Sequence, residues 1–147
     1  MSVNYFAYGA NLDCRAMLGR CPNAQVLDRA SLADHRVVSM REGWLSITPA
    51  EGEQTEGLLW KLREEHLVAL DLYEEVDQGL YVHETRRVDP QQGDPIDALV
   101  YVGANSGPGL LHAEYAERVA AAARRELGEA AASRIEALSE AWSSNDH

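Results

Sequence analysis

The sequence predicts an α+β domain whose short strands form an antiparallel or mixed sheet, either open or closed into a barrel. Most of the first hundred residues are short β-branched and aromatic runs separated by Gly, Pro and Asp, and a stretch of helical spacing at 63–74 is inserted between them. Ala- and Glu-rich helical stretches then follow at the end of the chain. Regular strand–helix alternation is missing, which argues against a doubly wound fold. With 147 residues, 46% of them hydrophobic, we predict one domain over residues 1–147.

Strands are predicted where a short apolar run ends at a turn residue. The expected strands are residues 3–8, 24–30, 35–40, 44–48, 55–62, 80–88 and 96–102. A turn at Asp34 would separate the second strand from the third. A polar turn is expected over 50–54, and a Gly-rich loop over 103–109.

Helices are predicted over residues 13–20, 63–74, 111–128 and 130–141. Either Asn11 or Asp13 can cap the first of them. We expect the last two to pack on the barrel or against another subunit, which leaves a homodimer open. Trp142 would then cover an edge.

The charge of the chain argues against two classes of partner. A formal net charge of -11 repels phosphate backbones and anionic lipid surfaces, so we expect neither nucleic-acid nor membrane binding. No segment approaches the roughly 18 apolar residues of a membrane span. We see no signal peptide and expect a cytoplasmic protein. A small anionic substrate would need a local positive site.

The cysteines and histidines do not form a metal-binding pattern. Cys14 and Cys21 lack the spacing of a zinc site, and reduced thiols are expected rather than a disulfide between them. Cys14 is a weak candidate for a nucleophile, because no neighbouring base is visible that would activate its thiol. Four of the five histidines, at positions 35, 66, 83 and 112, are scattered along the chain. We therefore expect neither a metal nor any other cofactor.

An acidic stretch at the end of the second predicted helix breaks a local rule. Residues 71–77 carry four carboxylates where the partial negative charge of a helix C-terminus disfavours them. Repulsion and burial would raise the pKa of a carboxylate there, as a general acid/base near neutral pH requires. The alternative is a solvated acidic turn, which is common on an acidic protein.

A second place where the sequence departs from local preference lies at the end of the first predicted strand. Tyr8, Gly9, Ala10 and Asn11 lead into a predicted helix start, so backbone N–H groups there are expected to point outward. Such groups can bind a carboxylate or an oxyanion, and Gly9 permits close approach of a ligand. An ordinary strand-to-helix turn is the alternative.

Five segments of the chain, two of which contain the places just described, resemble segments of the γ-glutamylcyclotransferase family. Residues 5–12 (YFAYGANL) are similar to the family's YFAYGSNL opening. The other similar segments are RCP at 20–22, ADHR at 33–36, GLLWKL at 57–62 and LDLYEEVDQGLY at 70–81. The similarity runs in order over roughly residues 5–102, and it is weak in the C-terminal helices.

The resemblance implies a small mixed β-barrel flanked by helices, and an enzyme that releases 5-oxoproline from γ-glutamyl compounds. It places the catalytic carboxylate on Glu74 and not on Glu75. The residues predicted to bind substrate are Tyr5, Phe6, Ala7, Tyr8, Gly9, Ala10, Asn11 and Tyr101. Tyr101 either lines the pocket or belongs to the core, and for Tyr81 we favour the core. Residues 41–44 and 103–109 are expected at the pocket mouth.

Two departures from the family pattern leave the substrate open. Ala10 replaces the family's Ser, and Glu75 replaces the Gly after the catalytic Glu, which adds charge and affects the turn. A tailoring enzyme that removes a γ-glutamyl protecting group is one variant of the expected activity. A non-catalytic binding domain that kept the fold is the rival from another class, and the retained Glu74 argues against it.

Overall fold

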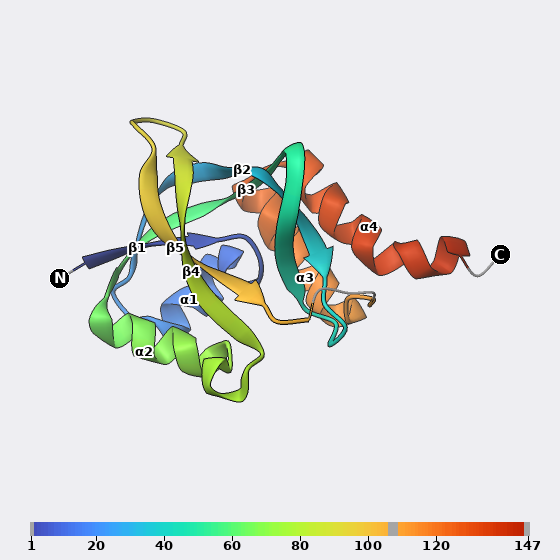
Figure 1. Cartoon of the computed structure of the whole chain (residues 1–147), viewed down its shortest axis with the longest axis horizontal. Coiled ribbons are helices and arrows are strands. Elements are labelled where there is room, and N and C mark those ends of the chain that lie inside the picture. Colours follow the sequence, from blue (N-terminus) through green and yellow to red (C-terminus); the bar gives the residue numbers. More distant parts are fainter. Residues whose placement is uncertain (1, 106–108, 146–147) are drawn as a thin grey trace.

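In the computed structural model, which describes residues 2–105 and 109–145, five strands close into a mixed barrel (Figure 1). The strands are β1 (Ser2–Ala7), β2 (Gln25–Ser39), β3 (Leu45–Arg63), β4 (Tyr81–Pro90) and β5 (Ile96–Gly103), in the order β1-β3-β2-β4-β5. Neighbours are antiparallel except β1 and β5, which close the barrel in parallel at Tyr5 and Leu99. The predicted α+β barrel is confirmed.

Four α-helices and two 3-10 turns surround the barrel. They are the turn η1 (Ala10–Leu12), α1 (Cys14–Arg20), α2 (Glu64–Tyr73), the turn η2 (Val76–Gln78), α3 (Ala113–Glu126) and α4 (Glu129–Asn145). In Figure 1, α1 and α2 lie on one side of the barrel, and α3 and α4 form a pair on the other. The side chain of Trp142 lies outside the described residues.

The sequence-based prediction of two separate strands around Asp34 is wrong. β2 runs without a break from Gln25 to Ser39, and Asp34 forms a bulge in it with a left-handed backbone (φ 57°). The partner β3 likewise continues through the turn predicted over 50–54. The Asp34 carboxylate accepts a hydrogen bond from the Gly52 N–H (3.0 Å), so turn residues stabilise an irregularity in the pairing of β2 with β3 instead of ending the strands.

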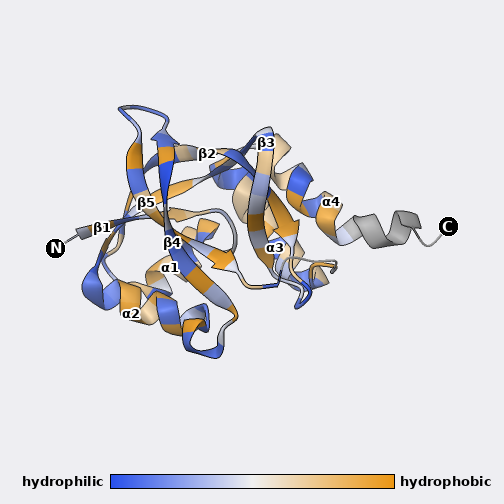
Figure 2. Cartoon of the chain, in the orientation of Figure 1, coloured by the Kyte–Doolittle hydropathy of each residue, from blue (hydrophilic) through white to orange (hydrophobic). Residues whose placement is uncertain are grey.

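The core fills the barrel and the space beneath α3. Trp60, Phe6 and Leu59 are among its largest fully buried side chains, and α3 contributes a face of small residues that includes Ala120 and Ala123. Figure 2 shows the polar tip of the β4–β5 hairpin projecting away from this apolar centre. No helix in the described ranges has the length and apolarity needed to cross a membrane.

The start of α1 depends on Asp13, one of the two predicted caps. Its Oδ1 accepts hydrogen bonds from the N–H groups of Arg15 (3.1 Å) and Ala16 (3.2 Å). Replacing Asp13 by Ala is expected to lower the free energy of unfolding by about 1 kcal/mol, because these two N–H groups lose their acceptor. Urea denaturation measures this loss, and an unchanged midpoint and slope would contradict it.

Candidate active site

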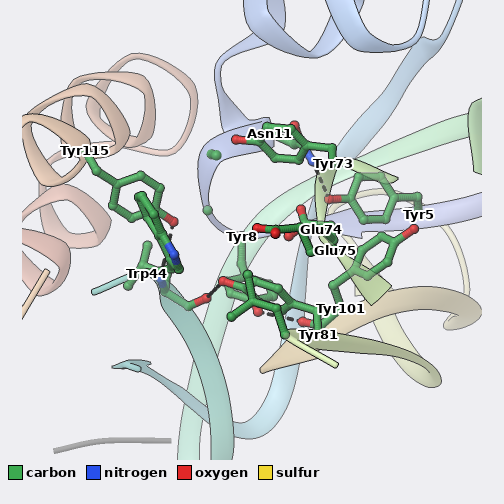
Figure 3. Close-up of a pocket in the computed structure, with 14 residues that line it drawn as sticks. Tyr5, Tyr8, Asn11, Trp44, Tyr73, Glu74, Glu75, Tyr81, Tyr101 and Tyr115 are labelled. Atoms are coloured by element: carbon green, nitrogen blue, oxygen red, sulfur yellow. Dashed lines mark hydrogen bonds between the residues drawn. The ribbon is translucent and has the colours of Figure 1, made fainter. Parts of the chain in front are cut away.

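A pocket of about 210 Å³ opens beside the end of β1, where α2, β4, β5 and α3 meet (Figure 3). Half of its lining side chains are aromatic. The lining residues are Tyr5, Tyr8, Gly9, Ala10, Asn11, Trp44, Leu45, Tyr73, Glu74, Glu75, Leu80, Tyr81, Tyr101 and Tyr115. The two places that the sequence singled out, residues 8–11 and Glu74, therefore lie on one cavity.

Glu74 is the partly buried carboxylate of this pocket. It directly follows α2, and its backbone N–H donates to the Leu70 carbonyl at 2.8 Å, which fixes where its side chain leaves the helix. Burial raises the pKa of Glu74 from its ordinary value of 4.5 to about 7, and the positive charge of Arg20 opposes part of this rise. A carboxyl group with a pKa near neutrality can both take up and return a proton at physiological pH.

The tyrosine hydroxyls around Glu74 are held by hydrogen bonds. Tyr8 donates to the Tyr101 carbonyl, and Tyr81 donates to the Leu45 carbonyl, both at 2.6 Å. Tyr101 in turn donates to a carboxylate oxygen of Asp71 at 2.6 Å. Burial raises the pKa of each of these three phenols, so they stay uncharged and act as neutral donors or acceptors.

The loop after β1 supplies backbone donors. Within the described residues, the N–H groups of Gly9 and Ala10 have no hydrogen-bond acceptor. A Cβ at Gly9 would lie 3.4 Å from the Tyr115 hydroxyl, so the loop packs closely against α3. Such unpaired N–H groups can bind a carboxylate or an oxyanion. The half-buried methyl group of Ala10 lines the same cavity.

The other predicted substrate-binding residues divide into two groups. Tyr5, Asn11 and Tyr101 line the pocket. Tyr81, for which the sequence favoured the core over the pocket, is buried and lines the pocket as well. Phe6 and Ala7 are buried in the core and are not among the lining residues. Because side chains alternate along a strand, β1 turns Tyr5 towards the pocket and its neighbour Phe6 away from it.

The carboxylates of the acidic stretch 71–77 lie in different environments. Asp71 faces Tyr101, with His83 Nε2 at 3.8 Å from its other oxygen, whereas Asp77 is exposed. Glu75 is exposed at the pocket, and its backbone is left-handed (φ 51°, ψ 46°). The turn conformation that a glycine would favour is therefore kept by a glutamate.

Several lining residues were not predicted individually from the sequence. Trp44 lies within the expected mouth segment 41–44 and packs between the rings of His112 (4.7 Å) and Tyr115 (5.0 Å). Residues 103–105 and 109 of the other expected mouth segment do not line the pocket, and 106–108 lie outside the described residues. No three His, Cys, Asp or Glu side chains gather as metal ligands in the described part of the chain.

Comparison with known proteins points to one family. A family model described as "Gamma-glutamyl cyclotransferase, AIG2-like" matches residues 5–122. Human γ-glutamylcyclotransferase is 30% identical over 114 residues, which are 71% of this chain and 61% of the human protein. The mouse protein is 29% identical over 111 residues, 69% of this chain and 59% of its own length. The chain thus spans about three-fifths of these curated relatives.

Solved structures agree with this comparison. A structure titled "Gamma-glutamyl cyclotransferase" superposes with a TM-score of 0.85 at 25% identity, covering 94% of this chain and 88% of that one. A yeast structure, whose title describes a cyclotransferase specific to glutathione, has a TM-score of 0.62 at 10% identity and covers 95% of this chain and 96% of the yeast chain. At that identity the likeness concerns the fold alone.

Proposed function

Because the chain belongs to the "Gamma-glutamyl cyclotransferase, AIG2-like" family, we propose that it cyclises the γ-glutamyl group of a small γ-glutamyl compound, releasing 5-oxoproline and a free amine. One observation carries the proposal. The partly buried carboxylate of Glu74, whose pKa is about 7, lines the same cavity as Gly9 and Ala10, whose N–H groups have no acceptor in the described part of the chain.

The proposed reaction needs one proton carrier and good orientation. The substrate's α-carboxylate binds the N–H groups of Gly9 and Ala10, and its α-ammonium lies near Glu74. Glu74 takes a proton from the ammonium, and the free amine attacks the γ-carbonyl carbon to form a five-membered tetrahedral intermediate. Glu74 then gives that proton to the leaving nitrogen as the original amide C–N bond breaks, and the ring nitrogen passes its second proton through Glu74 to the released amine, which leaves the neutral lactam. Attack within one molecule gains most of its rate from orientation.

The direct test is turnover on a panel of γ-glutamyl amino acids, peptides and amines, with 5-oxoproline release followed by chromatography. Release from at least one member is the expected result. The absence of release from every member, while the protein still binds some of them, would favour a non-catalytic binding domain. The panel also includes γ-glutamylated biosynthetic intermediates, because a tailoring enzyme would accept only those.

The pKa of Glu74 gives a prediction for the pH dependence. The base must be deprotonated in the free enzyme, so kcat/KM should rise with pH through a midpoint near 7 and level off above it. An acid limb centred near 4.5, the ordinary pKa of a glutamate, would contradict this assignment. The measurement is kcat/KM between about pH 4 and 9, with stability checked at each pH.

A further inference from the structure

Arg20, at the end of α1, contacts two residues of the pocket wall although it does not line the pocket itself. Its Nη1 donates to the Asn11 Oδ1 at 2.5 Å, and its guanidinium carbon lies 3.7 Å from the centre of the Tyr73 ring. Asn11 is almost fully buried, and both partners line the pocket beside Glu74 (Figure 3).

The contact between Arg20 and Asn11 fixes the direction of a hydrogen-bond chain. A guanidinium can only donate, so the Asn11 atom that faces it must be the amide oxygen. The amide nitrogen then faces the Tyr5 hydroxyl and donates to its oxygen at 2.9 Å. The proton of Tyr5 is not used in that bond, and it has no acceptor among the described residues. Because Tyr5 lines the pocket, this proton is available to a bound molecule.

From this chain we infer that Arg20 is a positioning residue, which orients Asn11 and thereby presents the Tyr5 hydroxyl as a hydrogen-bond donor to an oxygen of the γ-glutamyl group. The inference rests on the proposed function for the identity of the ligand. A neutral tyrosine suits this role, and burial and Glu74 both raise the pKa of Tyr5 above its ordinary value. Hydrogen bonds aimed at an oxygen on which negative charge develops contribute strongly to acyl transfer.

The charge of Arg20 gives a second measurement, the pH at which the acid limb of kcat/KM lies. That pH would not shift if Arg20 only stabilised the end of α1. The groups whose charges interact with Glu74 come from β1, the loop after it, α1, α2, β4, β5 and α3. They are Tyr5, Tyr8, Arg20, Tyr73, Tyr81, Tyr101 and Tyr115, and the carboxylates Asp71 and Glu75 lie on the same turn. Burial raises the pKa of each of these tyrosines, so they stay neutral, and Arg20 is the cation that lowers the pKa of Glu74. Removing its charge should therefore move the acid limb of kcat/KM to higher pH.

Four variants and one control test the inference, through kcat/KM on the pH plateau and through the position of the acid limb. Arg20→Met should lower kcat/KM by about tenfold or more, as expected for losing a hydrogen bond to a charged group. Arg20→Lys keeps the charge, so its acid limb should stay in place while part of kcat/KM is lost. In the Tyr5→Phe background, Arg20→Met should add less than about a twofold further loss, since both changes remove the same donor. Arg15→Met, on the exposed face of the same helix, should behave as wild type.

Asn11→Asp separates orientation from folding. The new carboxylate still accepts from Arg20, but it also accepts from Tyr5 and turns that proton away from the pocket. We expect unchanged folding by circular dichroism and a loss of kcat/KM similar to that of Tyr5→Phe. Wild-type kcat/KM in both Arg20→Met and Asn11→Asp, or a fully additive loss in the Arg20→Met/Tyr5→Phe double variant, would overturn the inference.

Calorimetric binding of 5-oxoproline gives a readout that needs no turnover. Its dissociation constant should rise about tenfold in Arg20→Met and in Asn11→Asp, relative to Arg15→Met. If the wild type binds 5-oxoproline but releases none from any substrate, the proposed function fails and the inference is judged on binding alone. Equal affinity in all variants, or no binding to the wild type, would overturn the inference.

Discussion

Replacing Glu74 by Gln is expected to lower kcat for 5-oxoproline release by about 10²- to 10⁴-fold, the usual contribution of a general acid/base. Glutamine keeps the shape of the side chain and removes its ability to take up a proton. Since the same group serves the attacking and the leaving nitrogen, no second side chain in the proposed reaction can take over. The loss should appear in kcat more than in KM, because the pocket walls stay in place.

Glu75→Gln is the matched control for that experiment. Glu75 is the next residue and lines the same pocket, but it is exposed, whereas Glu74 is partly buried and has the raised pKa. We expect the control to retain kcat within about threefold, as for a surface charge near a site. Equal losses in the two variants would refute the assignment of the base to Glu74. Wild-type turnover by Glu74→Gln would refute it as well.

Replacing Gly57 by Ala is expected to destabilise the fold by about 3 kcal/mol, at the upper end of the usual cost of overpacking. A Cβ at this position in β3 would lie 2.4 Å from the Ala7 carbonyl oxygen and 2.7 Å from Cζ of the Phe6 ring. The first of these atoms belongs to the backbone of β1, which cannot move without shifting the loop at residues 8–11. Activity should therefore fall together with stability.

Gly19→Ala is the control of opposite sign. Gly19 lies in α1, and a Cβ there would meet nothing within 4 Å. Because alanine has the higher helix propensity, we expect a gain of about 0.5 kcal/mol or more. Chemical denaturation of both variants measures the two effects. Comparable stability of Gly57→Ala and wild type would show that β1 and β3 can separate at this point without cost.

The sequence was most informative where a local pattern determines structure. The helix over 13–20 and the strand around Gly57 follow from capping, periodicity and turn residues, and both are present. The pattern was misleading at Asp34, because turn-forming residues also make bulges, and only the pairing with β3 distinguishes the two. From local rules alone, Glu74 could equally belong to a solvated acidic turn. Only the resemblance to the family, whose motifs occur in the same order, predicted that Glu74 and the loop at residues 8–11 form one site.

Contacts between distant segments account for what the sequence could not reveal. Trp44 and Tyr115 share one pocket wall although about seventy residues separate them in the chain. The contact between Arg20 and Tyr73 likewise joins α1 to α2. No periodicity links such pairs, because they meet only after the barrel has closed and the helices have packed against it.

The parallel closure of the barrel has a consequence during synthesis. Tyr5 is made almost first, yet it pairs with Leu99 of β5, next to the strand position that carries Tyr101. Since a chain grows from its N-terminus, β1 must wait for about a hundred residues before its second edge can pair. A nascent chain on the ribosome therefore holds Glu74 before it has a complete pocket, because β5 must still pair with β1 and the last lining residue, Tyr115, follows β5 in the chain.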